Sequence, residues 1–269
     1  MYEFDCPEPI TLALRIAGGD AEIIAEERRD ATVEVGPADN SEASRDAAAR
    51  TRVELHDGTL HIEAPEWTGW LFRRGPRVRM SVRLPHDCAL AVKVASADIR
   101  ATGRYRSASV TSASGDADIE YVTGDASVHA ASGDFRVGRV DGNLKINTAS
   151  GDITVGYVGG DSIAHSASGD IAVDHAGGSL RATTASGDIA VRTATTGTVR
   201  ANSASGDVSI GVAAGTGVWL DLSSISGDTR TDLTMPAGYA DQSAATLTLQ
   251  VRTVSGDIDV HRATVPAAA

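Results

Sequence analysis

Short runs of alternating apolar and polar residues fill most of the chain, and they recur at a nearly constant spacing. Every second run from Ser96 onward is marked by Ser-Gly-Asp or a close variant, with its first serine at Ser96, Ser114, Ser132, Ser150, Ser168, Ser186, Ser205, Ser226 and Ser255. The first five intervals are 18 residues each, and the later ones are 19, 21 and 29. A period this regular is typical of proteins made from stacked, similar units.

Each 18-residue unit divides into two halves of nine residues, and glycine is the second residue of each half. After the glycine, branched residues alternate with polar ones, as in Ile153/Val155 and Ile171/Val173. This alternation over about five residues, bounded by glycine, predicts a short strand between two turns. Two strands per unit predict one coil of an all-β, single-stranded parallel β-solenoid, with about seven coils stacked about 4.8 Å apart between Ser96 and Asp228.

Residues 1–95 lack the repeat but alternate strictly, for example in RVELHDGTLHIEA from Arg52, where His56-Asp57-Gly58-Thr59 is a hairpin signal. We expect an antiparallel β-rich cap over residues 1–95, because the open end of a solenoid needs cover. The solenoid domain is expected over residues 96–262, with C-terminal strands closing its far edge. Residues 263–269 are expected to form a disordered tail.

The repeated Ala-Ser-Gly-Asp followed by Ile or Val, after alternating N-terminal strands, resembles the bacterial β-strand-repeat family labelled "putative adhesin", a domain of unknown function. The resemblance covers nearly the whole chain. It implies a parallel β-helix, and it implies no established activity.

Composition and charge narrow the function classes. The 269-residue chain carries a formal net charge of −12 and only 4% aromatic residues, so its core must consist of small and branched side chains. The acidic balance argues against a nucleic-acid partner, which needs a basic face, and against anionic membranes. Neither a membrane-spanning apolar run nor the basic and apolar regions of a signal peptide are found. We therefore expect no transmembrane segment and a cytoplasmic location, with a surface location left open.

The recurring corner residues are the first candidates for chemistry. A nucleophilic serine needs one base and one orienting acid in a unique arrangement, whereas this serine recurs without a matching column of histidines. We interpret Ser-Gly-Asp as a structural corner in which Ser and Asp hydrogen-bond turn amides. Stacked aspartates repel one another unless amides or cations offset the charge. The cation alternative would place a metal ladder on Asp116, Asp134, Asp152, Asp170, Asp188 and Asp207.

Other polar residues give no enzymatic constellation. His129 and His165 occupy equivalent positions two coils apart, too far to share a zinc ion, so a polar ladder is expected. Asp174 and Arg192 lie one coil apart in one column, which predicts an ion pair between coils. We therefore predict no catalytic residue, no cofactor and no small-molecule ligand, and the protein is not expected to be an enzyme.

One segment without the repeat carries the strongest binding signal. The run WTGWLFRRGPRVR, from Trp67 to Arg79, combines aromatic and arginine residues. Exposed clusters of this kind are typical binding hot spots, although the same aromatics could instead cover the open end of the solenoid core. The partner-binding candidates are Trp67, Trp70, Phe72, Arg73 and Arg74.

Together these observations predict a non-enzymatic structural or interaction protein, a rigid adhesin-like β-solenoid scaffold that binds a protein partner or copies of itself. Two alternatives stay open: a carbohydrate-binding or carbohydrate-cleaving β-helix, and a cytoplasmic scaffold or sensor in the envelope-stress response. Aromatic residues along one face would favour the carbohydrate alternative. Tyr121 and Tyr157 share a column, but Arg139 lies between them and His175 follows.

Overall fold

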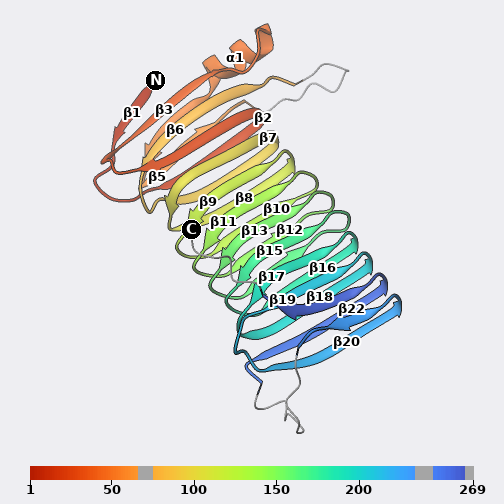
Figure 1. Cartoon of the computed structure of the whole chain (residues 1–269). Helices are drawn as coiled ribbons and strands as arrows, with labels where there is room; N and C mark the ends of the chain where they lie inside the picture. Colours follow the sequence, from red (N-terminus) through yellow and green to blue (C-terminus); the bar gives the residue numbers. More distant parts are fainter. Residues whose placement is uncertain (66–74, 234–244, 264–269) are drawn as a thin grey trace, which may run out of the picture. The chain divides into compact units, whose positions relative to one another are not determined.

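The structure is a computed structural model of the whole chain, and it describes residues 1–65, 75–233 and 245–263. Its regular structure is almost entirely β-strand (Figure 1), and one short helix, α1 (Glu42–Arg50), occurs in these ranges. Most strands pair in parallel with a strand one coil away, which confirms the predicted parallel β-solenoid. The chain divides into two compact units, Met1–Gly138 and Arg139–Ala269.

Two long strands form the centre of the first unit. β2 (Thr11–Glu26) and β7 (Ala89–Tyr105) pair in parallel over most of their length. Each spans both halves of a coil, and the register places Asp20 beside Asp98. β2 therefore forms a coil of its own, which precedes the coil with the first recognisable corner of the repeat, at Ser96–Asp98.

The remaining strands before β7 add to the two halves of β2. They are β1 (Tyr2–Asp5), β3 (Asp30–Pro37), β4 (Arg52–His56), β5 (Thr59–Glu63) and β6 (Val78–Pro85). β5 and β6 pair in parallel with β2, whereas β4 pairs antiparallel with β5, β3 with β6, and β1 with β3. The expected antiparallel arrangement thus holds for β1, β3 and β4, but β2 belongs to the parallel ladder.

The corner of β2 explains why the sequence repeat does not reveal this strand. Its residues are Ala17-Gly18-Gly19-Asp20, so the serine that marks later corners is missing. Gly19 nevertheless adopts a φ of +123°, close to the +124° of Gly115 in the first Ser-Gly-Asp corner. The same backbone turn is therefore made without the recognisable motif, since only glycine takes this conformation without strain.

Beyond β7 the first unit continues with β8 (Ser107–Ser114), β9 (Ala117–Val122), β10 (Ala126–Ala130) and β11 (Phe135–Val140), which crosses the boundary between the units. β8 pairs with the first half of β7 and β9 with its second half, and β10 follows on β8. Tyr105 and Phe135 are the largest fully buried side chains of this narrow core. Burial raises the pKa of the Tyr105 phenol, which lies 2.8 Å from the carbonyl oxygens of Ile23 and Thr102.

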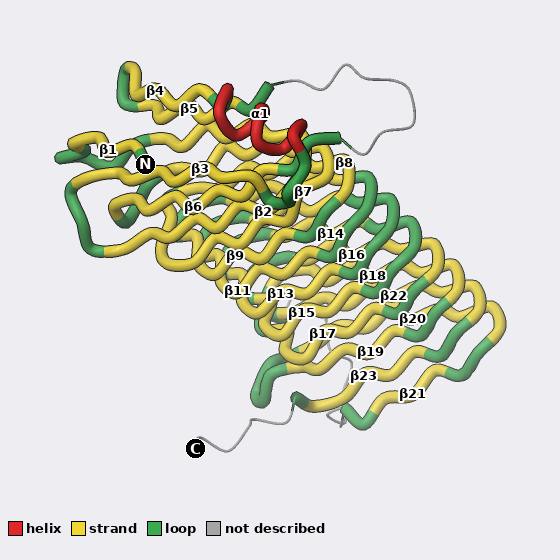
Figure 2. Tube along the Cα trace, turned by 90° about the horizontal axis from the view of Figure 1, so that it is seen from above, coloured by secondary structure: helices red, strands yellow, loops and turns green. Residues whose placement is uncertain are grey.

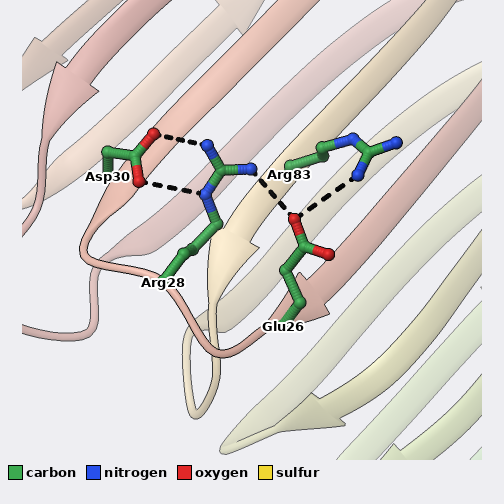
Figure 3. A network of polar contacts seen from close by, with 4 residues as sticks. All are labelled: Glu26, Arg28, Asp30 and Arg83. Atoms are coloured by element: carbon green, nitrogen blue, oxygen red, sulfur yellow. Dashed lines mark hydrogen bonds and ion pairs between the residues drawn. The ribbon is translucent and has the colours of Figure 1, made fainter.

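A network of charged side chains joins the turn between β2 and β3 to β6 (Figure 3). Arg28 contacts both oxygens of Asp30, and its Nη1 lies 3.1 Å from Oε1 of Glu26. Nη1 of Arg83 reaches the same glutamate oxygen at 3.5 Å. The hydrogen bond from Arg28 lowers the pKa of the Asp30 carboxyl, because it favours the charged form.

In the second unit the strands form two parallel ladders, one for each half of the coil (Figure 2). The first ladder contains, in spatial order, β12 (Leu144–Asn147), β14 (Ser162–His165), β16 (Leu180–Ser186), β18 (Gly197–Ser205), β22 (Leu247–Ser255) and β20 (Val218–Ser226). The second contains β13 (Ile153–Val158), β15 (Ile171–Ala176), β17 (Ile189–Ala194), β19 (Val208–Val212), β23 (Ile258–Arg262) and β21 (Thr229–Thr231).

The last two strands in the sequence, β22 and β23, do not lie at the end of the two ladders but one coil before it. β22 is inserted between β18 and β20, and β23 between β19 and β21. Leu249 of β22 is fully buried, whereas its neighbour Leu220 on β20 is only half-buried. Of the two C-terminal segments expected to close this edge, the one with β20 and β21 lies on the far side of the one with β22 and β23, and the fuller burial of β22 is consistent with its interior place.

Candidate functional site

The aspartates of the corners form hydrogen-bonded ladders. In each case Oδ1 of one aspartate accepts a hydrogen bond from the backbone N–H of the aspartate in the next coil. In the first unit the order is Asp98, Asp116 and Asp134, with N···O distances of 3.1 and 2.9 Å. In the second unit the order is Asp152, Asp170, Asp188, Asp207, Asp257 and Asp228, with distances of 2.7 to 2.8 Å.

These amide donors offset the repulsion between stacked carboxylates, which supports reading the repeat as a structural corner. Among the residues that the structure describes, no three His, Cys, Asp or Glu side chains form a group that could hold a metal ion. A cation ladder on Asp116 through Asp207 therefore stays a prediction.

A second set of residues at the corners is not recognisable as functional from the sequence alone. Ser166, Thr184, Ser203 and Thr253 precede the Ala-Ser-Gly-Asp or Val-Ser-Gly-Asp corners and are buried. Each hydroxyl lies 3.0 to 3.2 Å from the carbonyl oxygen of a corner glycine one coil away. The signal in the sequence is the hydroxyl residue two positions before the serine of each of these four corners, and its role is to satisfy a backbone acceptor inside the fold.

The first unit contains an open groove with a volume of about 910 Å³. Its polar lining includes Arg15, Arg77, Lys93, Ser96, Asp98, Thr111 and Ser114. Buried Ile16, Gly18 and Val94 contribute apolar lining beneath these side chains. The lining comes from β2, β7, β8 and the segments next to β5 and β6, so only the fold brings it together.

The charge of the groove is mainly positive. In the register Arg15 of β2 lies between Lys93 of β7 and Glu63 of β5, and among the described residues neither Arg15 nor Lys93 forms an ion pair. Arg77 lies 3.9 Å from Asp20, which is a weak contact. Asp98 is the acidic residue of the lining, and its carboxylate already accepts the N–H of Asp116. Two cations that face solvent in an otherwise acidic protein are suited to binding an anionic group.

The aromatic candidates of the sequence lie outside the described residues. Trp67, Trp70, Phe72, Arg73 and Arg74 all fall in the range 66–74, so their role as partner-binding residues stays a prediction. Arg77 and Arg79 of the same run are described, and both approach Asp20, at 3.9 and 4.0 Å.

In the second unit, cationic and aromatic side chains stack on one another along the second ladder. The guanidinium carbon of Arg139 lies 4.4 Å from the ring centre of Tyr157. The rings of Tyr157 and His175 are stacked, with centroids 5.1 Å apart and an angle of 7°. The column of Tyr157 thus forms a cation–π and π-stacked row.

The predicted ion pair between coils is confirmed in the same region. Nη2 of Arg192 lies 3.1 Å from Oδ1 of Asp174. Arg139 is likewise paired, at 2.7 Å from Asp141. Because these charges pair within the fold, this face offers fewer uncommitted groups to a ligand than the groove does.

These features describe a parallel β-solenoid whose motif residues serve the fold. The chain belongs to the Toastrack family (DUF4097), whose model matches residues 11–261. The resemblance inferred from the repeats is confirmed. No curated protein matches the chain. Across the part of the chain that the structure describes, no helix has both the length and the apolar character needed to cross a membrane.

Three solved structures are similar over nearly the whole length of both chains. A "putative adhesin" from Bacteroides fragilis is 12% identical, with a TM-score of 0.46, covering 96% of this chain and 95% of that one. A "putative lipid binding protein" from Parabacteroides distasonis is 13% identical, with a TM-score of 0.40 and coverages of 96% and 95%. A "putative cell adhesion protein" from Clostridium sporogenes is 11% identical, with a TM-score of 0.26 and coverages of 97% and 98%.

Proposed function

We propose that the protein is a non-enzymatic interaction scaffold that binds an acidic protein segment in the groove of the first unit. The observation that carries this proposal is the pair of adjacent cations, Arg15 and Lys93, without an ion-pair partner among the described residues. Like charges placed side by side destabilise a sheet, and an anionic ligand would add to the offset that Glu63, the register neighbour of Arg15 on β5, can provide.

The chemistry of the groove supports a peptide-like partner. Carboxylates of the partner would meet Arg15 and Lys93, while Ser96, Thr111 and Ser114 offer hydroxyls to its backbone or polar side chains. The half-buried Ala17, Ala64 and Pro65 can contact its aliphatic parts. The aspartates of the Ser-Gly-Asp motif, by contrast, already accept hydrogen bonds from backbone N–H groups at the corners, as Asp98 and Asp116 do.

The protein's own acidity makes self-association a specific form of this proposal. With a net charge of −12, a second copy presents acidic surface that the groove could receive. A contact between the groove and a different patch of a second copy would be heterologous and would build open assemblies. Sedimentation velocity over a range of protein concentrations distinguishes this form from binding to a separate partner.

Titration with fluorescent poly-L-glutamate tests the groove directly. The double variant Arg15→Gln/Lys93→Gln is expected to bind about a hundredfold or more weakly, because it loses two charge-assisted contacts of about 1.5 kcal/mol or more each. The control Arg106→Gln/Arg136→Gln removes the same charge from exposed residues that do not line the groove. Equal weakening in both double variants would show that total charge, not the groove, governs binding.

A further inference from the structure

A strip of cationic residues runs along the outward face of the first ladder of the second unit. The register places Lys145 of β12, Ile163 of β14, Arg181 of β16 and Arg200 of β18 in one column. All four side chains are exposed. We call this column the basic strip.

The cations of the basic strip are not neutralised by the fold. Lys145 and Arg181 have no ion-pair or hydrogen-bond partner among the described residues, and Arg200 donates only to the neutral Gln250, at 2.7 Å. Arg181 and Arg200 are direct neighbours in the register. Adjacent guanidinium groups repel each other. Although the chain has 36 acidic residues, no carboxylate of a described residue pairs with Arg181 or Arg200.

Acidic residues near the strip are already engaged. Asp161 precedes the strand that carries Ile163, and its Oδ1 accepts the backbone N–H of Ser179 at 2.9 Å. Asp221, at the far end of the same column, lies 3.8 Å from Arg252. The positive field is also felt by His165, whose pKa is lowered by burial and then by Arg181 and Lys145.

A column of neutral hydrogen-bonding groups runs beside the basic strip. It consists of Asn147, His165, Thr183 and Asn202, again one residue per coil. These amide, imidazole and hydroxyl groups both donate and accept hydrogen bonds. The outward face therefore offers cations next to neutral polar groups, repeated at the coil spacing of about 4.8 Å.

The type of ligand follows from what this face has and what it lacks. Single-stranded nucleic acids need aromatic platforms for successive bases, and His165 is the single aromatic ring among the residues of these two columns. A membrane surface needs an apolar anchor, whereas Ile163, at 38% exposed, is the one large exposed apolar side chain of the strip. A repeating polymer with carboxylates and hydroxyls fits both columns.

We propose that the basic strip binds an acidic polysaccharide, with carboxylates on Arg181 and Arg200 and sugar hydroxyls on Asn147, Thr183 and Asn202. Arginine suits this role because its planar fork binds a carboxylate through two hydrogen bonds. The strands of this face are paired on both sides, so the ligand contacts side chains alone. This inference goes beyond the groove of the first unit and does not depend on it.

Calorimetric titration of the full chain with polygalacturonate tests the proposal. Arg181→Gln/Arg200→Gln is expected to weaken binding about tenfold or more and to reduce its salt dependence, because two charge-assisted contacts are lost. The matched control is Arg192→Gln/Arg230→Gln, which removes two exposed arginines of the second ladder that are paired with Asp174 and Asp228. Binding unchanged in the first variant, or equally weakened in the control, would overturn the proposal.

Competing polymers and a folding check complete the test. Neutral dextran is expected not to bind; polyphosphate, poly-L-glutamate and anionic lipid vesicles are expected to compete weakly. Tighter binding of any of these through Arg181 and Arg200 would overturn the polysaccharide assignment. The melting temperature of Arg181→Gln/Arg200→Gln should stay equal or rise, because a like-charge contact is removed. Arg15→Gln/Lys93→Gln should bind polygalacturonate normally, which separates this proposal from the groove.

Discussion

Two columns of like charge in the second unit differ in whether the fold supplies partners for the charged groups. Each carboxylate of the aspartate ladder, from Asp152 to Asp228, accepts a backbone N–H from the next coil or ends the row. Arg181 and Arg200 of the basic strip are adjacent at the same coil spacing and receive no carboxylate. Repetition of a charged residue therefore does not by itself indicate a binding site, whereas a charge that the fold leaves unmatched is a candidate for one.

The largest loss in the free energy of unfolding is expected from a substitution at a corner glycine. A Cβ on Gly187 would lie 2.2 Å from the carbonyl oxygen of Gly169, and its φ is +149°. Gly187→Ala should therefore lower the free energy of unfolding by about 3 kcal/mol or more, measured by urea unfolding. Gly215→Ala is the control, because its φ is +78° but no atom lies within 4 Å of the added Cβ. It should cost about 1 to 2 kcal/mol; a similar loss in both variants would mean that the close approach of coils is unimportant.

The aspartate ladder itself is tested by removing one acceptor. Asp188→Ala leaves the N–H of Asp207 without the carboxylate that lies 2.8 Å away. We expect a loss of about 1 to 2 kcal/mol in the free energy of unfolding. Asp188→Asn keeps an oxygen acceptor and removes a repelling charge, so it should cost clearly less. Equal losses for Ala and Asn would show that the negative charge, and not the hydrogen bond, is what the corner requires.

The smallest effect is expected where a carboxylate and a guanidinium meet at the surface, at Asp30 and Arg28 (Figure 3). Because the folded-state pKa of Asp30 is lowered, its contribution is present above the unfolded-state value of about 3.9 and is lost as the pH falls through the folded-state value. The urea midpoints of the wild type and Asp30→Asn should differ at about pH 7 and converge at about pH 2. A difference that persists in acid would contradict a charge-dependent contact.

Local sequence chemistry predicted the repeated part of the fold. Glycine at each corner, alternation after it and a constant spacing were sufficient to predict parallel coils, because each strand needs only its equivalent in the next coil. The sequence does not reveal β2 as a parallel strand, because Ala17-Gly18-Gly19-Asp20 lacks the serine of later corners. The order of the last coils does not follow from the sequence, because a strand's place in a stack depends on burial against two neighbours.

The candidate sites were less predictable. Trp67 and its neighbours form a continuous run of aromatic and arginine residues, which the sequence shows directly. Arg15, Arg77 and Lys93 do not form a motif, since they lie on separate strands and meet only through the parallel register and the groove. Arg181 and Arg200 were visible in the sequence, but the absence of a partner for them depends on three-dimensional positions.

The sequence by itself determined the coil, its period and its structural corners, because these arise from interactions repeated every 18 residues. Tertiary structure decided which strand lies inside the stack and which acidic groups are used by backbone amides. It also decided which cations face solvent unpaired. Pairing between coils is local and periodic, whereas the neutralisation of a charge depends on every group that the fold brings within reach.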